Sequence, residues 1–196
     1  ESGIPILKRG QMLAYMVNDL QTIAVAGAHG KTTTTSMVFQ ALCGAGLDPT
    51  FILGGELQGS QLGARLGKSP YCVVEADESD ASFLELRPYL DFYGSTENIL
   101  KAFRRYFDCV KNGGFALVCG DDTEVQKLLA QEVSSRVVTY GEGTANDYYF
   151  TDWEAREMGS RCQVFKRGLR LGSLHLSVPG RHNTLNAIAA VAAACE

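Results

Sequence analysis

Short apolar runs that alternate with helical patterns fill the first 140 residues of the chain. The strand candidates are rich in β-branched and aromatic residues and lie at 22–26, 50–53, 71–75, 115–119 and 136–140. The helix candidates repeat apolar side chains at helical spacing and lie at 31–45, 95–112 and 122–129. Strands that alternate with helices favour parallel pairing through right-handed crossovers. The pattern therefore predicts an α/β fold with a mostly parallel sheet and helices on both faces.

Two of these helices also carry boundary signals. Ser95 is a candidate N-cap for the helix at 95–112, and Gly113 follows directly after its last position. Asp122 is placed to cap the helix that runs on through Leu129.

From Asp147 to Val178 the apolar pattern changes to a period of two, with turns near 157–160 and at Gly168. We expect a small antiparallel extension of two or three strands over residues 147–178, as an edge or a flap. Pro179-Gly180 ends this region, and the last helix begins near His182 or Asn183.

The length of 196 residues predicts a single domain, in which residues 1–20 form a lead-in segment. The first residue is glutamate and not methionine, and the last helical pattern ends without a Gly or Asn cap. We therefore expect that further residues precede and follow this segment.

Charge and apolar content exclude several classes of function. The 18 Lys and Arg residues against 22 Asp and Glu give a net charge of −4, which provides no basic field for nucleic acid or an anionic membrane. No run approaches the roughly 18 apolar residues of a membrane span, so we expect a cytosolic protein without nucleic-acid or membrane partners. The six cysteines are scattered, which predicts reduced and mostly buried thiols.

The segment between the first strand and the first helix reads Gly27-Ala28-His29-Gly30-Lys31-Thr32-Thr33. Glycines let backbone N–H groups turn toward an anion, and the start of a helix adds positive potential. Lys31 supplies a positive charge for phosphates, and a hydroxyl at Thr32 or Thr33 is a candidate Mg²⁺ ligand. The usual phosphate loop has four residues between its glycines, but only two separate Gly27 from Gly30. A tight glycine turn with an incidental lysine is the alternative.

An acidic cluster follows the strand at 71–75 and comprises Glu75, Asp77, Glu78 and Asp80. Mg²⁺ prefers one or two carboxylates together with phosphate oxygens and water. Glu75, at the end of the strand, is the best candidate to complete such a site. The alternative is a solvated loop or a helix cap.

Three segments together resemble the Mur ligases of bacterial cell-wall synthesis. They are GAHGKTTTT at 27–35, VVEADESDASF at 73–83 and PGRHNTLNAIAA at 179–190. The resemblance covers nearly the whole chain as the central, ATP-binding domain of a three-domain enzyme. The flanking UDP-binding and C-terminal domains are not in this sequence. The run ADESDASF is most similar to the family members that join L-alanine to UDP-N-acetylmuramate.

The resemblance implies an ATP-dependent amide ligase that uses ATP and Mg²⁺. In such enzymes ATP phosphorylates the carboxylate of the nucleotide sugar, an amino group attacks the acyl phosphate, and ADP and phosphate leave. It implies UDP-N-acetylmuramate and L-alanine as substrates, and an isolated central domain that is inactive alone. The alternatives are a ligase for murein-tripeptide recycling, a folylpolyglutamate synthase, or a stand-alone nucleotide-binding module without ligase activity.

The resemblance also implies residue roles. Lys31 would stabilise charge on the transferred phosphoryl group, and Thr32 with Glu75 would hold Mg²⁺. Asn183 and Asn186 would contact adenine. The implied nucleotide-binding set is Gly27, Ala28, His29, Gly30, Lys31, Thr32, Thr33, His182, Asn183 and Asn186.

Other polar residues have two open interpretations. His29 either approaches the muramyl carboxylate or a phosphate, as a catalytic group, or packs locally. His182 either contacts adenine or caps the last helix. Ser79, Asp80 and Ser82 either bind substrate or act as caps, and a structural role is favoured for His175 in the alternating region.

The sequence departs from the family pattern after Leu90. The family continues there with a strand and an N-x-E-x-D-H motif, whose histidine binds a second Mg²⁺. Here Leu90 is followed directly by Asp91-Phe92-Tyr93-Gly94, so this histidine is missing from the sequence. Either the stretch is deleted, or an omitted segment has been closed up in the numbering.

Overall fold

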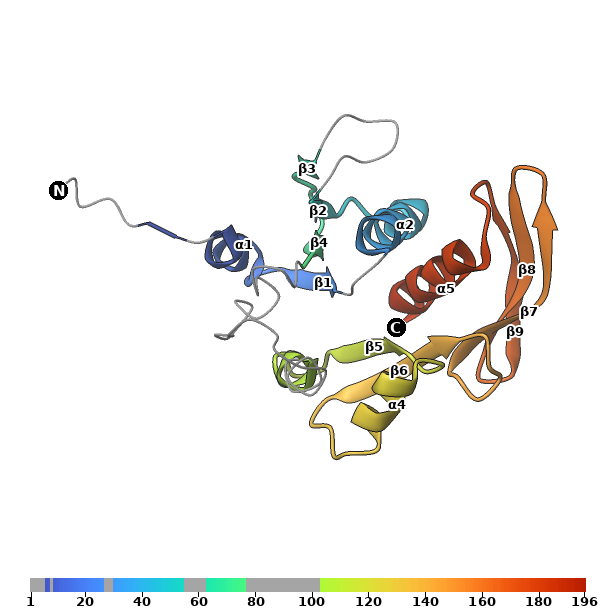
Figure 1. The fold of residues 1–196 in the computed structure, drawn as a ribbon. Coiled ribbons are helices and arrows are strands. Elements are labelled where there is room, and N and C mark those ends of the chain that lie inside the picture. The colour runs from blue at the N-terminus through green and yellow to red at the C-terminus, as the bar shows by residue number, and fades with distance from the viewer. Residues whose placement is uncertain (1–5, 8, 27–29, 55–62, 77–102) are drawn as a thin grey trace.

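The computed structural model describes residues 6–7, 9–26, 30–54, 63–76 and 103–196. Figure 1 shows the elements in this order: α1 (Arg9–Val17), β1 (Gln21–Val25), α2 (Lys31–Gly44), β2 (Thr50–Ile52), β3 (Ala64–Arg65), β4 (Tyr71–Glu75), β5 (Phe115–Cys119), α4 (Thr123–Leu129), β6 (Arg136–Gly141), β7 (Tyr148–Arg156), β8 (Gly159–Lys166), β9 (Leu169–Leu176) and α5 (Arg181–Cys195). Residues 103–108 are also helical.

The first sheet has the strand order β1-β4-β2-β3. Strands β1 and β2 both pair with β4 in parallel, and the short β3 pairs with β2 in the antiparallel sense. Successive side chains of a strand point to opposite faces. Cys72 and Val74 of β4 therefore pack with α1, whereas Val73 packs with α2. The expectation of helices on both faces is confirmed for this sheet.

Helix α1 lies in the segment that the sequence predicted only as a lead-in. Its buried residues include Leu13 and Val17, which are four positions apart and so share one face of the helix. This spacing is the signal that would have predicted the helix.

The second sheet has the strand order β5-β6-β7-β8-β9. Strands β5, β6 and β7 pair in parallel, and β7, β8 and β9 pair in the antiparallel sense. The antiparallel extension predicted over 147–178 is thus confirmed as three strands. These three strands continue the sheet that β5 and β6 begin, and they make up most of that sheet.

The expected single sheet is observed as two. In the part of the chain that the structure describes, no strand of the first sheet pairs with a strand of the second. The mixed α/β class and the parallel pairing of the predicted strands nevertheless hold in both sheets.

The helix predicted at 95–112 ends earlier than expected, since residues 109–112 are not helical. The amides of Cys109 and Val110 donate to carbonyls three residues back, those of Tyr106 and Phe107. This tighter bonding is typical of a terminating turn. By contrast, Asp122 caps α4 as predicted, because its carboxylate accepts from the amides of Glu124 and Val125.

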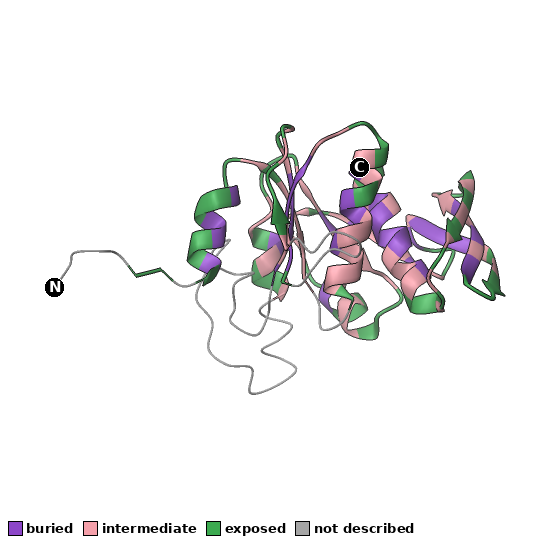
Figure 2. Cartoon of the chain, turned by 90° about the horizontal axis from the view of Figure 1, so that it is seen from above, coloured by how far each residue is buried: buried purple, intermediate pink, exposed green. Residues whose placement is uncertain are grey.

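Helix α5 lies between α2 and the second sheet (Figure 1). On one side Ile188 and Ala192 pack against Val138 and Tyr148 of the sheet, and on the other side Ala190 packs against α2. Small alanine side chains let the helix approach both neighbours closely. Figure 2 shows buried residues along α5 and along the strands beside it. The α2–α5 contact therefore joins the two halves of the core.

Two further expectations concern the whole chain. All six cysteines are free, as predicted, but the expectation that most are buried is wrong, since only Cys72 and Cys162 are. Burial raises the pKa of these two thiols to about 11. Cys195, however, is exposed. Within the described ranges, no helix combines the length and apolar character that crossing a membrane requires, and a cytosolic location stays a prediction.

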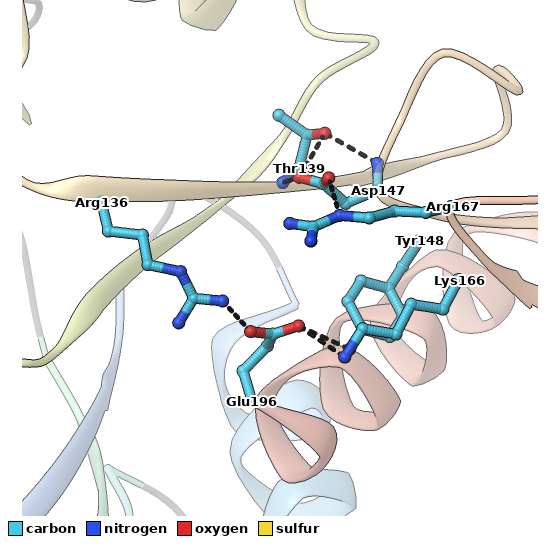
Figure 3. A network of polar contacts seen from close by, with 7 residues as sticks. All are labelled: Arg136, Thr139, Asp147, Tyr148, Lys166, Arg167 and Glu196. Atoms are coloured by element: carbon cyan, nitrogen blue, oxygen red, sulfur yellow. Dashed lines mark hydrogen bonds and ion pairs between the residues drawn. The ribbon is translucent and has the colours of Figure 1, made fainter.

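Four side chains converge at the end of α5 (Figure 3). The Glu196 carboxylate, only 5% exposed, pairs with Arg136, accepts from the Tyr148 hydroxyl at 2.9 Å and pairs with Lys166 Nζ at 2.8 Å. Beside it, Arg167 Nε donates to Asp147 at 2.8 Å. The hydrogen bond from Lys166 is the main cause that lowers the pKa of Glu196 to about 2, and the same bond raises the pKa of Lys166 to about 12.

We predict an acid-sensitive contribution to stability from this cluster. A carboxyl group whose pKa is lower in the folded than in the unfolded state stabilises the fold above the unfolded pKa, about 4.3 for glutamate. That contribution is lost as the pH falls toward 2. The free energy of unfolding, measured by urea denaturation between about pH 6 and 2.5, should therefore fall less steeply in Glu196→Gln than in the wild type. Equal slopes would contradict the assignment, and Glu124→Gln, at an exposed pair on α4, is the control.

Candidate nucleotide-phosphate site

The parallel pairing of β1 with β4 fixes where the candidate site lies. Val25, the last residue of β1, is in register with Glu75, the last residue of β4. The amide of Ala76 also donates to the carbonyl of Val25 at 3.0 Å. The chain therefore leaves β1 toward the glycine-rich segment at the same sheet edge where Glu75 is presented.

The start of α2 is suited to bind an anion. Gly30 is its N-cap residue, with a left-handed backbone (φ 77°), and no side chain in the described part of the chain caps the helix. The first turn contains Lys31 and no acidic residue. The N–H groups of a first helical turn have no partner within the helix, and together with the helix dipole they give this end positive potential, which nothing acidic in the turn neutralises. The predicted strand and helix are confirmed, and of the glycine segment between them Gly30 is the residue that the structure describes.

Glu75 connects the end of β4 with the start of α2 and with the residue after Leu53, which follows β2. Thr32 Oγ1 in the first turn of α2 donates to Glu75 Oε1 at 2.9 Å. The amide of Gly54, just after β2, donates to Glu75 Oε2 at 2.8 Å. Both carboxylate oxygens are therefore oriented, and one of them lies directly beside the threonine hydroxyl.

This pair of oxygens fits a magnesium ion. Neighbouring ligands of an octahedral Mg²⁺, each about 2.1 Å from the ion, lie about 3.0 Å apart, close to the 2.9 Å between Thr32 Oγ1 and Glu75 Oε1. Among the described residues, no group of three or more His, Cys, Asp and Glu side chains is arranged to hold a metal. One hydroxyl and one carboxylate, completed by phosphate oxygens and water, is therefore the arrangement that the residues support.

Helix α5 brings the third predicted segment to the same place. A Cβ atom at Gly30 would lie 3.0 Å from Asn186 Oδ1, so the Asn186 amide packs on the start of α2. Asn183 Nδ2 donates to the carbonyl of Pro179 at 2.7 Å. The His182 ring lies over Gly180, where a Cβ atom would come within 2.6 Å of the ring.

The structure thus brings together Gly30 with Asn186, and Thr32 with Glu75, from distant parts of the sequence. Lys31 and Thr33 lie in the first turn of α2, and His175 is exposed on β9. Several candidates lie outside the described residues: Gly27, Ala28, His29, Asp77, Glu78, Ser79, Asp80, Ser82 and the junction of Leu90 with Asp91. Their proposed roles stay predictions.

Two contacts at the site were not expected from the sequence. The amide of Gly54 donates to Glu75, but the sequence shows at this position only a pair of glycines after an apolar run. The hydroxyl of the half-buried Tyr106 donates to the carbonyl of Ala24 near the end of β1 at 3.1 Å, and desolvation raises the pKa of Tyr106. Tyr106 belongs to the apolar stripe of its helix, which predicts packing but gives no sign of this hydrogen bond.

Fold and site together define the class: an α/β domain in which the start of a helix, after a left-handed glycine, meets a strand-end carboxylate. The family profile described as the Mur ligase middle domain matches residues 81–194. The chain belongs to this family.

Sequence relatives agree with the family assignment. The chain is 52% identical, over 209 residues, to the UDP-N-acetylmuramate–L-alanine ligase of Syntrophomonas wolfei. That alignment includes all of the chain but 45% of the relative. The chain thus spans less than half the length of this relative.

Solved structures give the same fold. A UDP-N-acetylmuramate:L-alanyl-γ-D-glutamyl-meso-diaminopimelate ligase from Neisseria meningitides superposes with a TM-score of 0.85 and 28% identity, over 98% of this chain and 67% of that one. The UDP-N-acetylmuramate–alanine ligase of Thermotoga maritima gives a TM-score of 0.73 and 28% identity, over 94% of this chain and 44% of that one.

We predict that Gly30 is required for the start of α2. Alanine at a left-handed position costs about 1–2 kcal/mol, and its Cβ atom would press against Asn186. The free energy of unfolding of Gly30→Ala, measured by urea denaturation, should fall by about that amount. Gly44→Ala is the matched control, because Gly44 ends the same helix with open space around it. If the two variants are equally stable, the assignment of strain at Gly30 is wrong.

Proposed function

We propose that the chain is the central domain of an ATP-dependent ligase that joins L-alanine to UDP-N-acetylmuramate. The observation that carries the substrate assignment is the 52% identity, along the whole chain, to a ligase named for that reaction. The meeting of Thr32 with Glu75 beside the uncapped start of α2 supports the use of ATP and Mg²⁺. The flanking domains, which would supply the remaining substrate contacts, are part of the proposal.

The proposed reaction has two steps. A carboxylate oxygen of UDP-N-acetylmuramate attacks the γ-phosphorus of ATP, the bond to the bridging oxygen breaks, and ADP leaves. The amino group of L-alanine then attacks the acyl carbon, the acyl–oxygen bond breaks, inorganic phosphate leaves, and the amine loses a proton. Phosphoryl transfer of this kind depends mainly on positioning and on neutralising charge.

The residues of this chain would divide that work. Amides at the start of α2 would bind phosphate oxygens, and Lys31 would offset charge on the transferred group. Mg²⁺, held by Thr32 and Glu75, would supply further positive charge at the phosphates. Asn183, Asn186 and His182 would lie toward adenine, and His29 with Ser79, Asp80 and Ser82 would face the acceptor substrate.

A second candidate is a ligase for murein-tripeptide recycling, which joins a free tripeptide in place of L-alanine. The observation that favours it is the TM-score of 0.85 to the Neisseria ligase, whose name includes such a tripeptide. Both candidates use the same phosphate chemistry and differ in the amine that attacks.

The deciding experiment measures ATP-dependent phosphate release by the full-length gene product. UDP-N-acetylmuramate and L-alanine are supplied separately and together, and the tripeptide replaces L-alanine in a parallel series. Release that requires UDP-N-acetylmuramate and L-alanine together supports the first proposal. Release only with the tripeptide favours the second, and release with neither substrate supports a nucleotide-hydrolysing module.

We predict that Lys31→Ala abolishes turnover and leaves the melting temperature nearly unchanged. Lys31 lies in the first turn of α2 and is partly exposed, so we expect its side chain to act on the phosphates and not to pack in a core. Phosphate release and thermal unfolding are measured on the same preparation, with Lys127→Ala on α4 as the control. A parallel loss of stability and activity would contradict the proposed role of Lys31.

For Glu75→Ala we predict a lower rate together with a lost or strongly weakened dependence on Mg²⁺. Removal of the carboxylate leaves Thr32 Oγ1 without the neighbouring oxygen that completes the proposed ion site. The rate is titrated with MgCl₂ for the variant, for the wild type and for the control Glu124→Ala. An unchanged dependence of the rate on Mg²⁺ would contradict the role of Glu75 and indicate that Asp77 or Glu78 is the metal ligand.

A further inference from the structure

An ion pair with two parallel hydrogen bonds fixes the first residue of α5. Arg181 Nε donates to Glu142 Oε1 at 3.0 Å, and Arg181 Nη2 donates to Glu142 Oε2 at 2.5 Å. The two side chains are 53% and 39% exposed, and an exposed pair contributes little to stability. The forked geometry instead restricts the direction in which the arginine points.

Aromatic side chains of β7 hold the same guanidinium from another direction. The carbon Cζ of Arg181 lies 5.1 Å from the ring centre of Trp153 and 5.9 Å from that of Phe150. Cations over aromatic faces at these distances are attracted to the ring. Arg181 is thus held by a carboxylate and by two rings.

The first turn of α5 has a second anchor at Thr184, which is fully buried. Trp153 Nε1 donates to Thr184 Oγ1 at 3.0 Å, and the Ser160 hydroxyl lies 3.2 Å from the same oxygen. Trp153 therefore contacts both anchors, and β7 and β8 set the rotation of the helix at its start.

Glu142 itself lies in a restrained turn after β6. Its amide and that of Gly143 donate to the Asp121 carboxylate, which also accepts from Asn146 Nδ2 at 2.8 Å. A Cβ atom at Gly141 would lie 2.3 Å from Asp121 Oδ2, so a larger residue does not fit there without displacement. The carboxylate that binds Arg181 therefore projects from a fixed backbone.

We propose that Arg181 and Glu142 are positioning residues for nucleotide binding. Arg181 directly precedes His182 and Asn183. Asn186, five residues after Arg181, packs against the start of α2 at Gly30. By holding the start of α5, the pair sets where these side chains lie relative to the start of α2. The second sheet thus acts on the nucleotide site through α5, although none of its strands belongs to the sheet that carries Glu75. This inference rests on the proposed function.

The test compares Glu142→Gln with Glu154→Gln in the full-length gene product. Glu154 forms an exposed ion pair with Arg156 within β7, and among the described residues no hydrogen bond or ion pair joins these two side chains to α5, so Glu154 is the control. The KM for ATP, kcat and the melting temperature are measured, together with the affinity for Mg²⁺-ADP by calorimetry. We expect Glu142→Gln to raise the KM for ATP and the Kd for ADP about tenfold, with kcat and melting temperature close to the control.

Three further variants separate positioning from a general structural role. Arg181→Lys keeps the charge but loses the fork, and should weaken ADP binding as Glu142→Gln does. The double variant Glu142→Gln/Arg181→Lys should be no weaker than the single variants, because both changes break one interaction. Glu142→Asp keeps the carboxylate and should recover part of the affinity.

The outcomes distinguish this inference from the proposed function. If the wild type binds ADP and Glu142→Gln binds it equally well, the positioning role is wrong while the nucleotide site stands. A lower melting temperature in step with the lost affinity, not recovered in Glu142→Asp, would also overturn positioning. If the wild type binds no nucleotide, the proposed function fails and this inference fails with it.

Discussion

The packing of α5 between α2 and the second sheet is the constraint on which the rest of the described structure depends. The strands form two sheets that share no strand in the described ranges, so side-chain packing joins them and not backbone hydrogen bonds. Alanines at 187, 189, 190 and 192 are buried there and allow the helix to contact both neighbours. Larger side chains at these positions would separate the two sheets, because a close-packed interior has no room to absorb them. The approach of Asn186 to Gly30 follows from this packing.

Glu75 has a comparable role within the first sheet. The strand order places β4 between β1 and β2, so a residue at the end of β4 can reach groups that follow either neighbour. Glu75 uses one oxygen for Thr32 and the other for Gly54. A parallel sheet thus presents a fixed carboxylate at its carboxyl edge, which is where ligands of open α/β sheets bind. The positive start of α2 and this carboxylate are complementary when a magnesium-bound phosphate lies between them.

The sequence predicted those parts of the molecule that local patterns specify. The runs at 71–75 and 115–119 matched β4 and β5, and the cap at Asp122 was predicted from one residue type at one position. For the metal ligands, the glycine loop and the strand-end carboxylate left Thr32 and Thr33 open, and the resemblance to the Mur ligases implied Thr32 with Glu75. The structure places Thr32 and Glu75 in contact, and their role as metal ligands stays a prediction. The roles assigned to residues 27–29 and 77–82 depend on a part of the chain that the structure does not describe.

Features that depend on distant contacts were not predictable in this way. The period-two pattern of residues 147–178 identified antiparallel strands but could not tell an appended flap from a continued sheet, because that depends on pairing between β6 and β7. Arg181 and Glu142 are 39 residues apart, and the sequence around neither residue indicates that they form an ion pair. Helix α1 was missed for a different reason, since its buried face is short and its other face carries the exposed Met12, Tyr15 and Met16.

A crystal structure of the full-length gene product with ADP and Mn²⁺, with the metal located by its anomalous scattering, tests the central claim most directly. The account predicts the β-phosphate at the start of α2. It also predicts the metal within about 2.3 Å of both Thr32 Oγ1 and a Glu75 oxygen, in octahedral coordination. A metal bound elsewhere, with the Thr32–Glu75 hydrogen bond intact and no phosphate near Lys31, would contradict it.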